Sequence, residues 1–384
     1  MGTNTGAASW NASLIGLPEG RRRLDTPALI VDLSALHHNI EFMARFATDS
    51  SVALRPHVKT HKSIEIARRQ VAAGAIGVSC ATLGEAEIMV AGGIPGVLIT
   101  SPMVTESKIT RLIALARQAG PSQLMMVVDQ LDNAKQLATA ALDLPHPLTV
   151  LIDYCAGYGR TGVGDAYQAL ELARYIADQP CFELAGLQAY AGNLQHLLNI
   201  DERTARTKQL HEQITHLVFE IGKEGIRIPI ITGAGTGTYE LDARSKVFTE
   251  LQVGSYVFMD VEYMKVLETG GRTCPLRVAL FVQTAVVSHP ASQGWVTVDG
   301  GTKCFSTDGG MPVASKRECQ DNLYAFFGDE HGKLLVSGRK PEVGARIEFI
   351  TPHCDPTVNL HDVFHVVNGE TLVAIWPIDA RGKR

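Results

Sequence analysis

Residues 52–62 read Val52-Ala53-Leu54-Arg55-Pro56-His57-Val58-Lys59-Thr60-His61-Lys62, an apolar start followed by a cluster of basic side chains. The apolar start is typical of a buried strand, and the basic cluster stands where that strand ends. A lysine amine is a nucleophile only when it is neutral, and nearby positive charge together with partial burial lowers a lysine pKa. Lys59 is therefore a candidate Schiff-base lysine. The alternative is a solvated basic turn that caps the strand.

This strand is the first of eight strand-like runs that alternate with amphipathic helical stretches. Such an alternation predicts a (β/α)8 TIM-like barrel, in which the active site lies at the C-terminal ends of the strands. Lys59 stands at such an end. The eight runs cover residues 52–59, 76–82, 96–101, 123–130, 148–155, 183–191, 228–235 and 251–260.

The residue composition and its pattern change after Asp260. Runs rich in β-branched and aromatic residues follow, broken by glycine and proline, and no helix of good period separates them. This pattern predicts a smaller, mostly β second domain. We expect an N-terminal segment at 1–25 that leads into the barrel or pairs with the β domain, the barrel at 26–265, and the mostly β domain at 266–384.

Composition excludes two classes of partner. The chain has 384 residues, 45% of them hydrophobic, and a formal net charge of −5, so no broad basic surface for nucleic acid is expected. No run of about 18 apolar residues or signal-type leader is visible, which predicts a cytoplasmic protein without a membrane span. No CxxC spacing occurs, so reduced thiols are expected. The seven cysteines are Cys80, Cys155, Cys181, Cys274, Cys304, Cys319 and Cys354.

Two glycine-rich segments follow the last predicted strands. Gly233-Ala234-Gly235-Thr236-Gly237-Thr238 offers backbone N–H groups and hydroxyls, and late strands of such barrels often hold a phosphate in loops of this kind. Gly254-Ser255-Tyr256 is expected beside it. The alternative is a glycine turn that lets a helix begin. A dinucleotide fingerprint does not fit this late position in the chain.

Near the C-terminus, His353-Cys354-Asp355 places an imidazole and a carboxylate two residues apart. The pair is a candidate metal site, and the alternative is an ordinary polar pair. Imidazole with carboxylate suits Mn²⁺ or another fairly hard divalent ion, whereas Cys354 as a ligand would favour zinc. His57, His61 and His196 could add ligands or act as acid–base groups, but each taken singly is better explained as a hydrogen-bonded pocket wall.

These motifs together resemble the D-threonine aldolase and D-serine dehydratase family, pyridoxal-phosphate enzymes with the fold of alanine racemase. The resemblance runs from Thr26-Pro27 to Trp376-Pro377. It rests on the basic cluster around Lys59, on the strand Gln188-Ala189-Tyr190 with Gln195-His196 behind it, on the two glycine segments, and on His353-Cys354-Asp355-Pro356-Thr357.

The resemblance implies roles for particular residues. Lys59 would carry pyridoxal phosphate, and Arg160 would face its pyridine nitrogen. His353 and Asp355 would bind a divalent metal, Mn²⁺ before Mg²⁺, Co²⁺ or Zn²⁺. The remaining cofactor-binding positions implied are Tyr190, Gly235, Thr236, Gly237, Thr238, Gly254, Ser255 and Tyr256. A homodimer with the active site at its interface is also implied.

The activity implied is retro-aldol cleavage of a β-hydroxy-D-amino acid, such as D-threonine to glycine and acetaldehyde, with His196 or a metal-bound water as the base. Dehydratases of the family resemble His-x-Cys centres and aldolases His-x-Asp centres, so His353 and Asp355 favour an aldolase. The alternatives are a D-serine or 3-hydroxyaspartate dehydratase, in which Lys59 removes the α proton, a 3-hydroxy-D-aspartate aldolase, a racemase, and a non-catalytic pyridoxal-phosphate carrier.

Overall fold

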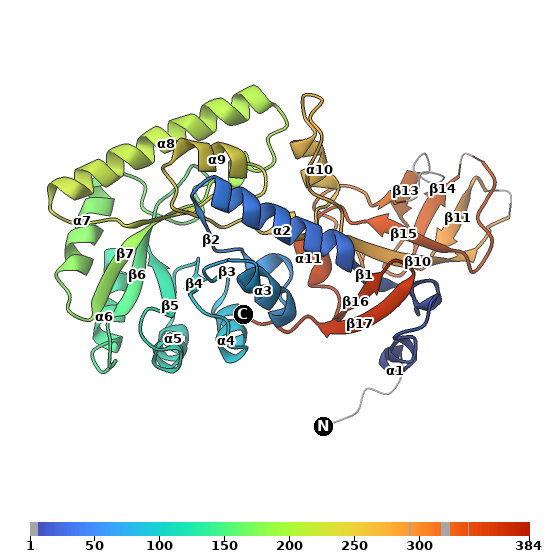
Figure 1. The fold of residues 1–384 in the computed structure, drawn as a ribbon, viewed down its shortest axis with the longest axis horizontal. Coiled ribbons are helices and arrows are strands. Elements are labelled where there is room, and N and C mark those ends of the chain that lie inside the picture. Colours follow the sequence, from blue (N-terminus) through green and yellow to red (C-terminus); the bar gives the residue numbers. More distant parts are fainter. Residues whose placement is uncertain (1–6, 292, 316–322, 337) are drawn as a thin grey trace. The chain divides into compact units, whose positions relative to one another are not determined.

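The structure of the chain is a computed structural model that describes residues 7–291, 293–315, 323–336 and 338–384 (Figure 1). These residues form two compact units. The barrel unit consists of Met43–Gly254, Thr269–Arg272 and Gly382–Arg384. The β unit consists of the described residues of Met1–Phe42, Ser255–Glu268 and Thr273–Arg381. The units differ in extent from the ranges 26–265 and 266–384, which stay a prediction.

Eight parallel strands form the sheet of the barrel unit, as the alternation of runs predicted. An isolated parallel bridge between His57 and Ser79 joins the segment after the first strand to the next strand, so the sheet nearly closes on itself. In the order in which they pair, the strands are β2 (Ala53–Leu54), β9 (Glu250–Leu251), β8 (Ile230–Gly233), β7 (Phe182–Ala189), β6 (Leu148–Asp153), β5 (Leu124–Val128), β4 (Val97–Ile99) and β3 (Val78–Cys80).

Helices connect these strands and lie on the outside of the barrel (Figure 1). Short polar side chains start several of them: Thr82 accepts a hydrogen bond from Glu85 N–H, and Asp165 accepts one from Gln168 N–H. The strands are buried because both faces are covered by side chains. The helices are α3 (Ile64–Ala72), α4 (Leu83–Ala91), α5 (Glu106–Ala119), α6 (Leu131–Ala140), α7 (Ala166–Ala177), α8 (Ile200–Lys223) and α9 (Tyr239–Ser245).

The β unit is built on a nine-stranded sheet in which β1 comes from the start of the chain. β1 pairs antiparallel with β10 and parallel with β16, and its residues from Ala28 to Val31 are buried. The strands are β1 (Ala28–Asp32), β10 (Leu280–Ser288), β11 (Trp295–Val298), β12 (Val313–Ala314), β13 (Leu323–Phe326), β14 (Gly332–Leu335), β15 (Arg346–Ile350), β16 (Val363–Asn368) and β17 (Thr371–Pro377).

The remaining helices are α1 (Ala7–Ala12), α2 (Leu33–Asp49), α10 (Val261–Leu267) and α11 (Cys354–Val358), with short 3-10 turns at Gly20–Arg23, Val58–Thr60, Gly192–Leu194 and Ser255–Val257. No helix in the described part of the chain combines the length and apolar character that crossing a membrane requires. Six of the cysteines are free thiols. The seventh, Cys319, lies outside the described residues.

Candidate active site

Lys59 lies in the 3-10 turn Val58–Thr60 and is half-buried. The first barrel strand ends earlier than the run 52–59 predicted, at Leu54, and the turn follows it after residues 55–57. The backbone N–H of Lys59 donates to Nδ1 of His57 over 3.3 Å, and the N–H of His57 donates to the carbonyl of Val253 over 3.0 Å. The turn is therefore tied to the segment after β9. It stands at the C-terminal end of its strand, which is where the barrel interpretation puts the active site.

The basic side chains around Lys59 have their own partners. Arg55 forms a bidentate pair with Glu250, with both N–O distances at 2.8 Å and both residues buried. Lys62 pairs with Glu85. The sequence predicted that neighbouring positive charge would act on Lys59, but the charges of Arg55 and Lys62 are each compensated by a carboxylate within the barrel unit.

Gly254 lies against this turn at a distance that no larger residue permits. A Cβ at Gly254 would stand 2.7 Å from Oγ1 of Thr60 and 3.4 Å from Cβ of His57. Oγ1 of Thr60 is buried and has no hydrogen-bond partner among the described residues. A buried hydroxyl normally finds a partner, so this group beside Lys59 is suited to a bound polar ligand.

The loop Gly233–Thr238 is buried along its length, and Ala234 holds a left-handed backbone conformation with φ of +64°. Helix α9 begins directly after Thr238. A Cβ at Gly235 would collide with the side chain of Gln195, and a Cβ at Gly237 would collide with the backbone carbonyl of the same residue. The side-chain oxygen of Gln195 accepts the N–H of Gly237 over 3.0 Å. The glycines thus serve close packing and the start of a helix, while a phosphate at this loop stays a proposal.

Arg160 lies in the exposed loop after β6, between two tyrosine rings. Its guanidinium carbon is 5.9 Å from the ring centre of Tyr158 and 6.0 Å from that of Tyr190, within reach of cation–π attraction. Asp153 and Gln188 line the same recess, and Gln188 donates to Oδ1 of Asp153 over 2.9 Å. Burial raises the pKa of Asp153 above its ordinary value. Arg160 and Tyr190 are therefore close together, as a shared role in one site requires.

His196 is exposed in the turn after Gly192–Leu194, whereas its neighbour Gln195 is only 1% exposed. An exposed imidazole exchanges protons readily with water, which suits an acid–base group.

The β unit contains the candidate metal pair at the start of α11. Nδ1 of His353 is 2.9 Å from Oδ2 of Asp308, and Oδ1 of Asp355 accepts a hydrogen bond from Ser255 over 3.3 Å. Tyr256, next to Ser255, is buried. The structure thus brings together His353, Asp355 and Ser255 within the β unit, while Lys59, Arg160, Tyr190 and the loop Gly235–Thr238 belong to the barrel unit.

Cys354 stands between the two candidate ligands but is fully buried. Burial raises the pKa of its thiol well above the ordinary value, and the carboxylates of Asp260 and Asp355 add to that effect. The backbone N–H of Cys354 donates to Asp260 over 2.9 Å. The arrangement favours Asp355 over Cys354 as the second ligand.

Comparison with known proteins identifies the family of the chain. The alanine racemase N-terminal domain model matches residues 31–262, and the serine dehydratase domain model matches residues 279–367. D-threonine aldolase of Arthrobacter sp. is 38% identical, over 94% of this chain and 93% of that protein. The chain belongs to the D-threonine aldolase and D-serine dehydratase family. It is therefore a pyridoxal-phosphate-dependent lyase with the alanine racemase-like fold.

Two further members of the family are similar along their length. 3-Hydroxy-D-aspartate aldolase of Paracoccus denitrificans (strain Pd 1222) is 33% identical, over 97% of this chain and 95% of that protein. The crystal structure of D-threonine aldolase from Filomicrobium marinum superimposes with a TM-score of 0.88 at 37% identity, covering 94% of this chain and 96% of that chain.

The residues present fit the cofactor of the family. The unpartnered hydroxyl of Thr60 lies next to Lys59 in the chain, and the missing side chain of Gly254 leaves the approach to that hydroxyl free of a Cβ. A covalently held phosphate ester needs hydrogen-bond donors of this kind beside the lysine.

The fit to a metal is partial. No group of three His, Cys, Asp or Glu side chains that would hold an ion occurs within the described ranges, so His353 and Asp355 would supply two protein ligands. Burial works to lower the pKa of His353, but the carboxylates of Asp355, Asp308 and Asp260 outweigh it and raise that pKa. The same surplus of negative charge attracts a divalent cation. Asp308 contacts Nδ1 of His353, and a carboxylate on one ring nitrogen is a common second contact of metal-binding histidines.

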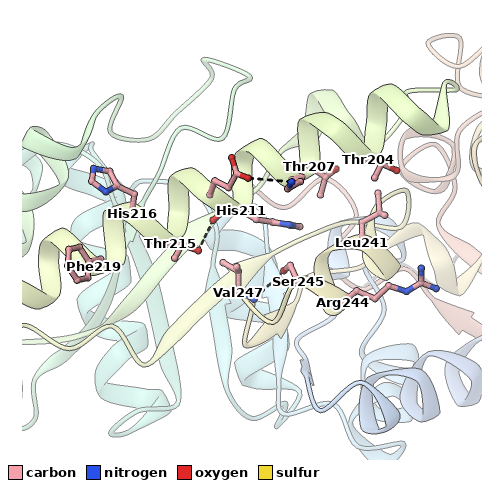
Figure 2. A pocket seen from close by; sticks show the side chains of 12 residues that line it. Thr204, Thr207, His211, Thr215, His216, Phe219, Leu241, Arg244, Ser245 and Val247 are labelled. Atoms are coloured by element: carbon pink, nitrogen blue, oxygen red, sulfur yellow. Dashed lines mark hydrogen bonds and ion pairs between the residues drawn. The ribbon is translucent and has the colours of Figure 1, made fainter.

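A groove of about 740 Å³ lies elsewhere on the barrel unit and contains none of the predicted site residues (Figure 2). Residues of α8 and of the stretch from Leu241 to Val247 line it. Its size therefore does not mark it as the active site of this family member. His211, which lines the groove, lies 2.7 Å from Oδ1 of Asp242.

The sequence did not single out Gln195 as a buried group, nor Asp308 or Asp260. Gln195 stands beside His196 in the motif. The signal for a residue packed against the glycine loop was the spacing of Gly235 and Gly237, which leaves two positions without a side chain. Asp308 is 45 residues from His353 in sequence, and no local pattern connects them.

Proposed function

We propose that this chain cleaves β-hydroxy-D-amino acids by a retro-aldol reaction that depends on pyridoxal phosphate and a divalent metal, with D-threonine giving glycine and acetaldehyde. The observation that carries the choice of aldolase is the pair His353 and Asp355, with the side chain of Cys354 between them fully buried. The resemblance to aldolases at 38% and 33% identity supports the same choice.

In this proposal Lys59 holds the cofactor covalently. Bound pyridoxal phosphate supplies an electron sink for the pair of electrons left on Cα when the Cα–Cβ bond breaks. Arg160 would face the pyridine nitrogen. Because a guanidinium stays protonated and has no acceptor, Arg160 would keep that nitrogen from carrying a proton of its own. Thr60 and the loop Gly235–Thr238 with Gly254, Ser255 and Tyr256 hold the phosphate.

His353 and Asp355 are proposed to hold the metal, with Mn²⁺ suited to imidazole and carboxylate ligands. A bound divalent ion lowers the pKa of a hydroxyl that it contacts. His196 is the proposed base that takes the proton of the substrate β-hydroxyl, and its exposure lets it pass that proton to water.

A second candidate is supported by the 3-hydroxy-D-aspartate aldolase relative, since that substrate differs from D-threonine in a second carboxylate. Dehydration is a third outcome, because D-threo-3-hydroxyaspartate dehydratase of Delftia sp. (strain HT23) is 30% identical over 81% of this chain. In a dehydratase, Lys59 would remove the α proton and the β-hydroxyl would leave.

The deciding experiment supplies the protein with pyridoxal phosphate and Mn²⁺ and offers D-threonine, L-threonine and 3-hydroxy-D-aspartate in turn, with and without EDTA. Glycine and acetaldehyde from the D isomer alone, lost with EDTA, are expected. Keto acid and ammonia would instead assign a dehydratase. Glycine and glyoxylate formed much faster than acetaldehyde would assign the 3-hydroxy-D-aspartate aldolase.

We also propose that the protein is a cytoplasmic homodimer whose active site is completed at the dimer interface, as the family resemblance implies. Light scattering after size-exclusion chromatography tests the dimer. A monomer with full activity would contradict it.

A further inference from the structure

Both ends of the buried side-chain amide of Gln195 form hydrogen bonds. Its Nε2 donates to the carbonyl of Ala191 over 3.1 Å and to Oγ1 of Thr238 over 3.0 Å. Its Oε1 accepts the N–H of Gly237 over 3.0 Å. Since one partner is a carbonyl and another is an N–H, the orientation of the amide is fixed.

Two glycines of the loop allow it to pack closely against Gln195. A Cβ on Gly235 would collide with Oε1 of Gln195, and a Cβ on Gly237 would collide with its backbone carbonyl. The side chain of Gln195 therefore fills the space that Gly235 leaves, while Gly237 lets the loop pass the backbone of Gln195.

The same network continues beyond the loop. Thr238 Oγ1 donates to Oδ2 of Asp242 over 2.5 Å, and Oδ1 of Asp242 is 2.7 Å from Nε2 of His211. A hydroxyl has one proton, so Thr238 donates to Asp242 and accepts from Gln195. Figure 2 shows the ring of His211 pointing from α8 toward the segment that carries Leu241 and Ser245. All five partners, Gln195, Gly237, Thr238, Asp242 and His211, belong to the barrel unit.

We infer that Gln195 is a positioning residue that holds the loop Gly235–Thr238 in the one conformation able to take the phosphate of the cofactor, with Thr238 and Asp242 fixing the direction of its hydrogen bonds. The inference rests on the proposed function, since it assumes that this loop holds the phosphate. Gln195 acts through the loop and touches neither substrate nor cofactor. The hydroxyl proton of Thr238 is already given to Asp242, so Thr238 contributes to the site by its place in the loop.

The test compares pyridoxal phosphate with pyridoxal, which lacks the phosphate. The dissociation constants of both are measured by fluorescence titration of the cofactor-free full-length protein, for the wild type and for Gln195→Met. Methionine keeps the length of the side chain but leaves the buried N–H of Gly237 without an acceptor. Pyridoxal phosphate is expected to bind about tenfold more weakly to the variant, with the affinity for pyridoxal unchanged.

The matched control is Asn133→Leu, which removes another buried amide of the barrel unit, one that donates to the carbonyl of Met103 over 2.8 Å. This variant is expected to lose stability without changing the ratio of the two affinities. Hydrogen exchange of the peptide covering residues 231–238, measured without cofactor, is expected to speed up in Gln195→Met and to stay at the wild-type rate in Asn133→Leu.

The outcomes separate the inference from the proposed function. Equal affinities of the wild type for the two compounds would overturn both, because the protein would then have no phosphate site. A wild type that prefers pyridoxal phosphate, with Gln195→Met preferring it equally, would overturn the inference alone, as would a parallel loss for both compounds. If Gln195→Met does not fold, Asp242→Asn takes its place, because it replaces the charged acceptor of the Thr238 hydroxyl by an amide, and a loss of several-fold confined to pyridoxal phosphate is expected.

Discussion

Charges are paired around Lys59 in the barrel unit, whereas negative charge is in excess around His353 in the β unit. Around Lys59, the cations of Arg55 and Lys62 are each paired with a carboxylate, and an unpartnered hydroxyl on Thr60 is left over. Around His353, one imidazole is faced by the carboxylates of Asp355, Asp308 and Asp260. A balanced setting with a spare donor suits a covalently bound phosphate ester, whereas a negative surplus suits a cation.

The largest effect is expected from Lys59→Ala, since no other side chain replaces a covalent attachment. The visible absorption band of the bound cofactor should disappear, and activity should fall by about 10³-fold or more. Lys208→Ala, an exposed lysine in the groove, is the control and should keep both. An unchanged absorption spectrum in Lys59→Ala would reject its role.

The balance of charge near Lys59 is broken by Arg55→Met. The buried carboxylate of Glu250 then has no cation, which should cost about 3 to 5 kcal/mol in the free energy of unfolding. Arg111→Met removes a bidentate pair with Glu87 that is exposed, and should cost about 1 kcal/mol or less. Urea unfolding of both variants measures the difference. Equal losses would mean that the pair with Glu250 behaves as a surface pair.

The pKa of His361, a second histidine of the β unit, is shifted in the opposite direction from that of His353. Burial lowers the pKa of His361 from 6.5 to about 4, and its Nε2 donates to the carbonyl of Cys304 over 3.0 Å. Because the folded pKa lies below the unfolded one, the unfolded chain binds more protons between these values, and stability is lost as pH falls from about 6.5 to 4. The loss reaches about 3 kcal/mol at most.

The variant His361→Gln keeps a donor for Cys304 but does not titrate. Its free energy of unfolding, measured by urea at several pH values, should therefore fall less steeply than that of the wild type over the same window. Identical slopes would show that His361 contributes nothing to acid sensitivity.

The negative surplus around His353 is weakened by Asp308→Asn, which keeps the size of the side chain. Loss of a second contact of this kind should reduce metal affinity by about 10- to 100-fold. Asp362→Asn, which removes an exposed carboxylate paired with Arg381, is the control. Calorimetric titration of the chelator-treated protein with Mn²⁺ measures both. Matching affinities in the two variants would leave Asp308 without a role at the metal.

Sequence patterns were sufficient for the barrel because each strand of it is a local run that is buried on both faces. They did not specify β1, since Ala28–Asp32 becomes a strand through partners at β10 and β16, about 250 and 335 residues further along. The site follows the same rule. Lys59 and His353 stand in distinctive local motifs, whereas Asp308 and Glu250 are defined only by distant residues that they contact.

Ala234 has a consequence for how fast the protein acquires its cofactor. A residue with a Cβ at φ of +64° is confined to this conformation by its neighbours, and it has fewer alternatives than glycine would have. The entropy of ordering the loop is therefore lost when the chain folds and not when the cofactor arrives. Reconstitution of the cofactor-free protein should thus proceed in a single kinetic phase, without a slow step of loop rearrangement.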